Sequence, residues 1–193
     1  MSAPSIRIET DRLVLREHEE GDESAMLPLL TDPVAMRYLP EIRAVDVDGV
    51  RDNLARAIAE RSRGEDRERF FLKVETRAGC LGSAEYVGEI GFTVIASAPE
   101  GRLVNLGYFF LPRWWGQGLC SEATRALVDY GFEKLGIVKV ETGCLAENRG
   151  SERVMEKAGF RKEGYFPLHV LHEGKLKDRV EYGLTREDWA RSR

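Results

Sequence analysis

The stretch LPRWWGQGLCSEATRAL, from Leu111 to Leu127, most constrains the fold of this chain, because β-rich residues precede it and a helical pattern follows it. Gly116 and Gly118 lie at the junction, directly after two tryptophans. Glycine lacks a Cβ atom, so the backbone there can approach an anion closely. The first helical turn has amides without intrahelical partners, and its dipole favours negative charge. The stretch predicts a strand, a turn and a helix, with the turn serving either phosphate binding or packing alone.

Two other phosphate-binding motifs do not fit this junction. A P-loop is excluded because no Gly-Lys-Ser/Thr follows the glycines. A dinucleotide fingerprint needs a third glycine where Ser121 stands, and it opens a βαβ unit rather than following a meander. Packing alone leaves Arg113, just before the glycines, without an explanation.

The periodicity of apolar residues along the chain predicts alternating blocks of strands and helices. Strands are expected at 6–16, 70–75, 86–95, 103–111, 138–144, 165–172 and 179–184. Helices are expected from Asp22 or Ser24 to Leu30, and at 47–62, 121–135 and 150–158. The three strands between 70 and 111 should form an antiparallel meander. The order β-α-α-β-β-β-α-β-α-β-β predicts a mixed α/β or α+β sheet.

Length and composition favour one globular domain that spans residues 1–193. The chain is 42% hydrophobic and 32% charged, and no apolar run approaches the roughly 18 residues of a membrane span. The N-terminus has no apolar segment typical of a signal peptide. We therefore expect a cytoplasmic protein without a membrane partner.

The net charge of −4 argues against nucleic acid as the main partner, because phosphate neutralisation needs a basic surface. The odd number of cysteines (Cys80, Cys120 and Cys144) and the lack of a C-x-x-C pair indicate reduced thiols. His169 and His172 have no third ligand nearby in the sequence, so no metal site is expected. Composition leaves a monomer and a homodimer equally open.

Four segments together resemble a known family. RWWGQG fits the Q/R-x-x-G-x-G/A pattern of the GCN5-related N-acetyltransferases, the GNAT superfamily. The chain is similar in particular to the Rim-like branch, the ribosomal-protein-alanine N-acetyltransferases. The segments are TDRLVLR at 10–16, GYFFLPRWWGQGLCSEA at 107–123, NRGSERVMEKAGF at 148–160 and EYGLTREDW at 181–189. The resemblance implies an α+β fold with a mostly antiparallel, splayed sheet of six to seven strands and about four helices.

The resemblance also implies where acetyl-CoA binds, in the gap where the sheet splays after its fourth strand. The strand backbone that pairs with the pantetheine arm is then Phe109, Phe110 and Leu111, and the amide near Phe110 meets the thioester oxygen. The residues that hold the pyrophosphate are Gly116, Gln117, Gly118, Leu119, Cys120 and Ser121. Arg113 either adds charge to the phosphate site or faces solvent. Trp114 and Trp115 are expected to pack the loop rather than to stack on adenine.

The resemblance suggests a catalytic set with one departure from the common pattern. Many relatives have a tyrosine seven residues after the signature asparagine, here Asn148, to protonate the leaving thiolate. That position is Met155, which has no proton to donate. In the Rim-like branch a serine three residues after the asparagine, Ser151, is suggested for this task, and Asn148 should contact the pantetheine. Both residues are also good helix caps, and the two roles can coexist.

A general base is expected on the central meander. Glu89 is the best-placed carboxylate, acting directly or through water, unless its side chain points to the surface. The alternatives are Glu85, Glu147 and Asp178. Tyr38, Glu41 and Asp178 are expected to line the acceptor pocket, where carboxylates would favour a cationic amine.

The expected function is acetyl transfer from acetyl-CoA to a primary amine by direct attack in a ternary complex. The acceptor is either a protein N-terminus or a small-molecule amine, because a fold fixes the donor better than the acceptor. Two alternatives remain open. Another acyl-CoA such as succinyl-CoA would need a cation, which Arg37 or Arg43 could supply, and a CoA-binding regulatory module would not catalyse at all.

Overall fold

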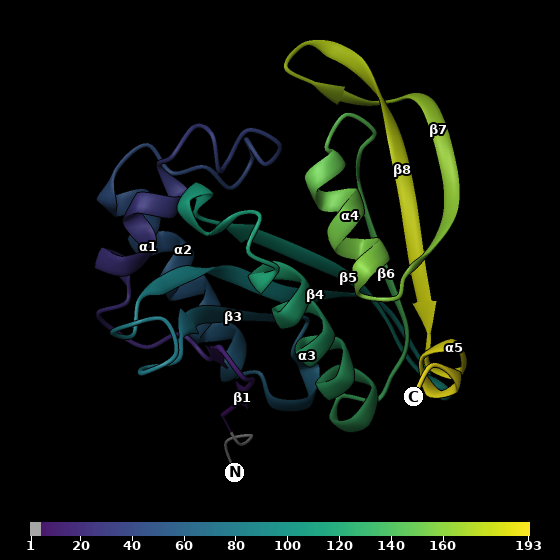
Figure 1. Cartoon of the computed structure of the whole chain (residues 1–193), viewed down its shortest axis with the longest axis horizontal. Coiled ribbons are helices and arrows are strands. Elements are labelled where there is room, and N and C mark those ends of the chain that lie inside the picture. The colour runs from purple at the N-terminus through teal and green to yellow at the C-terminus, as the bar shows by residue number, and fades with distance from the viewer. Residues whose placement is uncertain (1–4) are drawn as a thin grey trace.

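The computed structural model describes residues 5–193, apart from the side chain of Glu65. Within them, one sheet has the strand order β1-β2-β3-β4-β5-β6-β8-β7 (Figure 1). The strands are β1 (Arg7–Glu9), β2 (Leu13–Arg16), β3 (Arg69–Thr76), β4 (Tyr86–Ala98), β5 (Gly101–Phe110), β6 (Ile137–Leu145), β7 (Arg161–His172) and β8 (Lys175–Thr185). The helices are α1 (Glu23–Leu30), α2 (Val47–Arg61), α3 (Leu119–Lys134), α4 (Arg149–Lys157) and α5 (Arg186–Arg191), with short 3-10 turns η1 (Gly64–Asp66) and η2 (Pro112–Trp114). Residues 1–4, which the single-domain prediction includes, lie outside this description.

The structure corrects the expected first strand. Residues 6–16 do not form one strand but a hairpin, in which β1 pairs antiparallel with β2. Thr10 causes the reversal, because its amide donates to Leu13 O at 2.9 Å and its hydroxyl accepts from Leu13 N at 2.9 Å. The extra strand raises the sheet to eight strands, against the six or seven expected. The terminal TREDW segment adds α5, so the described chain has five α-helices where about four were expected.

The remaining elements confirm the mixed α/β prediction. β3, β4 and β5 form the antiparallel meander, and the β5–β6 pair is parallel. α3 begins two residues earlier than expected, at Leu119, directly after Gly118. None of the helices in the described residues is long and apolar enough to cross a membrane.

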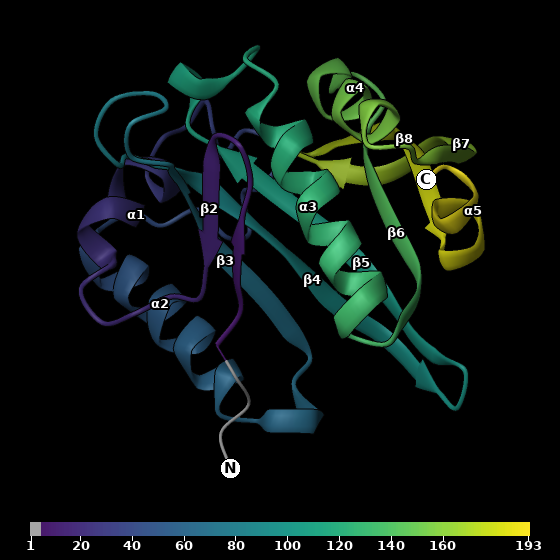
Figure 2. The ribbon, with the colours of Figure 1, turned by 60° about the horizontal axis from the view of Figure 1, so that its bottom comes forward.

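Helices cover both faces of the sheet, and this determines which strand residues become core. Alternate strand residues point to opposite faces. On one face, Leu13, Leu72 and Ile90 pack in a cluster with Leu119 and Leu127 of α3. The other face carries α1 and α2, whose buried residues pack with Tyr86 and Leu111 in a second cluster. Figure 2 shows α3 and α4 in front of the sheet, with α1 and α2 at the side of β2 and β3.

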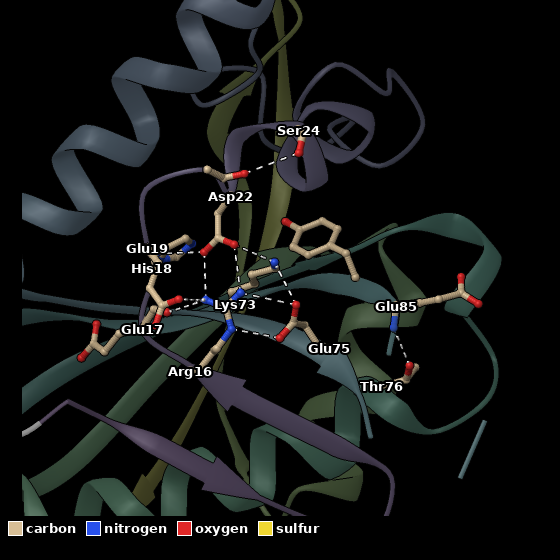
Figure 3. A network of polar contacts seen from close by, with 12 residues as sticks. Arg16, Glu17, His18, Glu19, Asp22, Ser24, Lys73, Glu75, Thr76 and Glu85 are labelled. Carbon is tan, nitrogen blue, oxygen red and sulfur yellow. Dashed lines mark hydrogen bonds and ion pairs between the residues drawn. The ribbon is translucent and has the colours of Figure 1, made fainter. Parts of the chain in front are cut away.

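A network of charged side chains occupies the face beneath α1 (Figure 3). Arg16 of β2 and Lys73 of β3 are register partners, and both bind Asp22, the residue before α1. Asp22 accepts from Arg16 at 2.9 Å and from Lys73 at 2.8 Å. Glu75 balances the second positive charge, with its carboxylate 2.9 Å from both Arg16 and Lys73. The network therefore fixes the start of α1 to the sheet.

Asp22→Asn should destabilise the protein by about 3 kcal/mol at neutral pH, because it removes one of the two carboxylates that balance Arg16 and Lys73. Burial alone would raise the pKa of Asp22, but the hydrogen bonds from Arg16 and Lys73 outweigh it and hold that pKa well below its usual range. The stabilisation is thus complete above the unfolded pKa of about 3.9 and is lost as pH falls toward the folded pKa. Urea titrations at several pH values should show that the difference in unfolding free energy between Asp22→Asn and wild type becomes smaller below pH about 4.

The matched control is Asp48→Asn, which removes an exposed ion pair with Arg51. It should cost less than about 1 kcal/mol. Equal losses in the two variants would contradict a structural role for the buried network.

Candidate active site

The site is built around the divergence of β5 and β6. These strands pair in parallel only from Arg102 to Asn105, opposite Ile137 to Glu141. Thr142 marks the end of the paired segment, because its buried hydroxyl donates to Leu106 O at 3.0 Å. Beyond this point the two strands separate, as Figure 2 shows. The last five residues of β5 therefore have one edge that pairs with no other strand of the described residues.

The register of β4 and β5 decides which backbone groups face the gap. The amide of Leu111 donates to Val87 O at 3.0 Å, toward β4. Backbone groups of successive strand residues point in opposite directions, so the amide of Phe110 points away from β4, toward the diverging β6. Phe109 and Leu111, which were grouped with Phe110 from the sequence, direct their polar groups toward β4 instead. The geometry therefore leaves Phe110 as the member of this trio with an amide in the gap.

The glycine-rich loop lies at the end of β5, where the gap opens. Gly116 and Gly118 have φ values of +74° and +77°, which strain any residue with a Cβ atom. Gly118 is the N-cap of α3, and no side chain among the described residues caps this helix. The amides of Leu119, Cys120 and Ser121 form the first helical turn, beyond reach of intrahelical carbonyls. The loop therefore presents amides at a positive helix end, suited to an anion.

Arg12, which the sequence did not single out, braces this loop. It lies in the β1–β2 turn, and its guanidinium donates to Gln117 O at 3.1 Å and to the Glu122 carboxylate at 2.7 Å. Thr10 also donates to Glu122, at 2.6 Å. No periodicity or spacing signals a contact between residues more than 100 positions apart, so only the fold reveals it.

The three side chains before Gly116 make polar contacts around the ends of β4 and β5. Arg113 lies 3.2 Å from the Glu85 carboxylate. Trp114 is half-buried and donates its indole N–H to Tyr86 O at 3.1 Å. Trp115 is about half exposed, and its indole donates to Phe110 O at 2.8 Å. Trp114 thus packs against the core as expected, Trp115 is held mainly by its hydrogen bond to Phe110, and Arg113 has a carboxylate partner.

Asn148 and Ser151 meet at the start of α4. Asn148 is the N-cap of the helix, and its Oδ1 accepts from Ser151 N at 3.2 Å. The Ser151 hydroxyl lies 2.7 Å from the hydroxyl of Tyr108, so this pair connects α4 to β5. Met155, which replaces the tyrosine of many relatives, is completely buried in the core. The capping role of Asn148 is thus present, and it places Ser151 beside the gap.

Two thiols lie near this junction, and both are held protonated at neutral pH. Burial raises the pKa of Cys120 to about 12 and that of Cys144 to about 11. Only the thiolate is a good nucleophile. Neither thiol is therefore equipped to carry an acyl group.

Glu89 lies on β4 with its side chain inside the protein. It is only 2% exposed, which rules out the surface alternative. Its carboxylate accepts from Tyr86 Oη at 2.6 Å and lies 2.7 Å from Nε2 of His18, which is equally buried. Glu89 opposes Phe109, so it lies next to the strand segment that lines the gap.

Glu89 changes the protonation of its neighbours. Burial alone would lower the pKa of His18, but the nearby Glu89, Asp22 and Glu17 carboxylates outweigh it, and the pKa is raised. The pKa of Tyr86 is raised well above its usual value, first by burial and then by Glu89. His18 gave no signal in the sequence, because a lone histidine beside charged residues reads as surface.

The alternative carboxylates are all engaged and more exposed. Glu85 pairs with Arg113, and Glu147 pairs with Lys177 of β8 at 2.7 Å. Asp178 accepts from Tyr165 Oη and from the amide of Leu168 at 2.9 Å. These contacts lower the pKa values of Glu147 and Asp178, through Lys177 and Tyr165 respectively.

The expected acceptor residues lie where the α1–α2 segment meets the β7–β8 hairpin. The ring of Tyr38 lies 6.0 Å from that of His172 at the end of β7. A small hollow beside the end of β6 is lined by Ala146, Glu147, Leu176, Lys177 and Asp178. Glu41 is exposed on the α1–α2 segment. The structure thus brings Asp178 together with Glu147 and places Tyr38 against the hairpin, which Figure 1 shows projecting beyond the other strands.

Comparison with known proteins assigns the family. A model described as an acetyltransferase (GNAT) domain matches residues 12–161. N-acetyltransferase YnaD of Bacillus subtilis is 29% identical over 184 residues, which cover 95% of this chain and 99% of YnaD. The ribosomal protein uS5-alanine N-acetyltransferase of Escherichia coli is 33% identical over 88 residues, 46% of this chain and 45% of that enzyme.

The fold agrees with these sequence matches. The crystal structure of a GNAT-family acetyltransferase from Bacillus anthracis matches with a TM-score of 0.78 and 27% identity, over 94% of this chain and 99% of that one. The chain belongs to the GNAT family and is an N-acetyltransferase.

Proposed function

We propose that the protein transfers the acetyl group of acetyl-CoA to a primary amine by direct attack within a ternary complex. The observation that carries this proposal is the divergence of β5 and β6 beyond Asn105, which leaves the amide of Phe110 facing the gap. The glycine loop lies at the end of the same strand. The pantetheine arm would lie along β5, with the pyrophosphate on the amides of Gly116 to Ser121.

Holding the amine against the thioester supplies much of the rate in such a complex. The Phe110 amide would stabilise the oxyanion that forms on the thioester carbonyl. Glu89 would take the amine's proton through water, because its burial prevents direct contact. Ser151 would donate to the sulfur as it leaves, and Asn148 would hold Ser151 in place.

Direct attack is favoured over an acyl-enzyme route by the state of the cysteines. A covalent route would need a thiolate near the thioester, and Cys120 and Cys144 have pKa values raised to about 12 and about 11. Fewer than about one thiol in a thousand would then be ionised at neutral pH. The amine itself is therefore the better nucleophile.

The acceptor side favours a cationic amine. Glu147 and Asp178 line the hollow beside β6 and have lowered pKa values, so both stay negative at neutral pH. Lys177 offsets one of these charges. A protein N-terminus and a small polyamine-like substrate would both satisfy this chemistry.

A thiol-release assay tests the proposal. Purified protein is mixed with acetyl-CoA and a panel of small amines and of short peptides with varied N-termini, and acetylated products are identified by mass spectrometry. We expect amine-dependent release of free CoA thiol. Succinyl-CoA in place of acetyl-CoA should give slower release with the same amine.

Three outcomes would contradict parts of this proposal. Faster release of free CoA thiol with succinyl-CoA than with acetyl-CoA would indicate that the protein transfers a succinyl group. Thermal stabilisation by acetyl-CoA without release for any amine would indicate a regulatory CoA-binding module. Acetyl groups retained on Cys120 or Cys144 in the absence of amine would indicate an acyl-enzyme route.

A further inference from the structure

Arg12 connects the β1–β2 turn to the glycine loop through one planar group. Its Nε donates to Glu122 Oε2 at 2.7 Å, and its Nη2 lies 2.6 Å from the same oxygen. Its Nη1 donates to Gln117 O at 3.1 Å. A guanidinium is rigid and carries only donors, so the two contacts with Glu122 fix the direction in which Nη1 points. The carbonyl of Gln117 is therefore held toward the β1–β2 turn.

Glu122 anchors this guanidinium from the first turn of α3. Its Oε1 accepts from the Thr10 hydroxyl at 2.6 Å and from the Arg12 amide at 3.0 Å, so the β1–β2 turn engages both carboxylate oxygens. Burial alone would raise the pKa of Glu122, but the hydrogen bonds from Thr10 and Arg12 outweigh it and lower that pKa. Glu122 is thus negative at neutral pH, and Arg12 balances a charge that would otherwise repel a phosphate bound at this helix end.

The position of the Gln117 carbonyl determines where the next amide points. The described residues contain no cis peptide bond. In a trans peptide the carbonyl and the following N–H point in opposite directions, so the amide of Gly118 points away from Arg12. It also points away from β2, which lies on the opposite side of α3 from α4 (Figure 2). Among the described residues, no group accepts a hydrogen bond from this amide, which leaves it available to an anion.

The glycines on either side of Gln117 make this orientation easy to lose. Glycine adopts positive and negative φ with similar ease, so Gly116 and Gly118 offer little resistance to rotation of the Gln117–Gly118 peptide. After such a rotation the carbonyl, which is the negative end of the peptide dipole, would face the anion in place of the N–H. The rotation would also break the hydrogen bond from Arg12 to Gln117 O. Arg12 therefore opposes it.

We propose that Arg12 is a positioning residue of the donor site, which holds the Gln117–Gly118 peptide with its N–H toward the pyrophosphate of CoA. The inference rests on the proposed function, in which the amides of this loop bind the pyrophosphate. Arg12 acts through the loop rather than as a phosphate ligand, because its guanidinium is already fixed on Glu122 and on Gln117 O. The loop is then ordered before CoA arrives, which removes part of the cost of binding.

Calorimetric titration with CoA tests this inference without an acceptor amine. Arg12→Lys keeps the positive charge, but an ammonium cannot bind Glu122 and Gln117 O in the fixed geometry of a guanidinium. The dissociation constant for CoA should rise about tenfold in Arg12→Lys, as expected for the loss of one hydrogen bond to a charged group, and at least as far in Arg12→Ala. Pantetheine, which lacks the pyrophosphate, should bind to both variants as it binds to wild type in ligand-observed NMR.

Amide hydrogen exchange reports the orientation of the peptide itself. In isotope-labelled wild type, CoA should slow the exchange of the Gly118 amide, because the pyrophosphate accepts its hydrogen bond. In Arg12→Lys saturated with CoA, this protection should be smaller, while that of the Ser121 amide, which belongs to α3, should remain. A poorly folded variant would instead lose protection throughout α3, so the measurement keeps the test valid if the substitution destabilises the protein.

Arg77→Ala is the matched control for Arg12→Ala. The guanidinium of Arg77 also binds the β1–β2 turn, through Thr10 O at 3.3 Å, but within the described residues it makes no hydrogen bond to the glycine loop. This variant should bind CoA as wild type does. Wild-type affinity for CoA in Arg12→Lys, an equal loss of affinity in Arg77→Ala, or an equal loss for pantetheine would overturn the inference alone. Failure of the wild-type protein to bind CoA would overturn the proposed function and the inference with it.

Discussion

Glu89→Gln should lower kcat by about 100-fold or more, the usual contribution of a general base. Glutamine has nearly the same shape but cannot accept the amine's proton. The Michaelis constant for acetyl-CoA should change little, because Glu89 is buried beneath α1 and lies outside the glycine loop. The measurement is kcat and kcat/KM for wild type and Glu89→Gln, with acetyl-CoA and the amine varied separately.

The same substitution should affect stability in a pH-dependent way through His18. Its raised pKa means that the ion pair with Glu89 contributes stability fully below the unfolded pKa of about 6.5. That contribution is lost as pH rises through the folded pKa. Thermal unfolding should therefore show Glu89→Gln furthest below wild type in mildly acidic buffer, with the difference shrinking in alkaline buffer.

Glu85→Gln provides the control, because Glu85 is a partly exposed carboxylate next to the same end of β4. Its kcat should stay within about twofold of wild type, as expected for a group without a role in proton transfer. If Glu89→Gln kept the wild-type kcat and lost only stability, Glu89 would be a structural anchor for His18 and Tyr86 rather than the base.

Gly118→Val should weaken acetyl-CoA binding by about 100-fold or more. Its side chain would stand among the amides at the start of α3, and losing two hydrogen bonds to a charged phosphate costs about 3 kcal/mol or more. Space exists for a Cβ atom there, since its nearest neighbour would be Arg12 Nη2 at 3.7 Å. The loss should thus come from the blocked anion site and the positive φ, and titration calorimetry with acetyl-CoA measures it.

Gly64→Val separates these two causes. Gly64 also has a positive φ, +61°, with nothing within 4 Å of an added Cβ atom, and it lies in η1, away from the glycine loop. It should lose stability comparable to that of Gly118→Val, while its affinity for acetyl-CoA stays unchanged. Undiminished affinity in Gly118→Val would show that the pyrophosphate binds elsewhere.

Much of the fold could be predicted because it depends on local patterns. The alternation in β3, β4 and β5 and the helical spacing in α3 are properties of neighbouring residues, and the structure confirms them. The hairpin of β1 and β2 could not be predicted in this way, because local patterns do not determine it. The reversal depends on the Thr10 side chain and on its contact with Glu122, more than 100 residues away.

The residues of the candidate site also fall into two groups, those indicated by local sequence and those revealed by long-range contacts. The glycine loop and the Asn148–Ser151 pair are short segments whose residues act together, so their sequence is enough to indicate them. His18, Arg12 and Tyr108 belong to the site through contacts with distant strands and helices. Residue type alone does not predict a role in the site for such side chains, because that role depends on the partner that the fold places beside each of them.

The sequence by itself determined the family resemblance, the order of elements from α1 to β8 and the position of the glycine loop, because these depend on adjacent residues and their periodicity. Only the tertiary structure decided that Glu89 is buried between His18 and Tyr86, and that Tyr108 meets Ser151. The physical reason is that burial and hydrogen-bond partners depend on which faces of the sheet the helices cover. That choice is made by long-range packing.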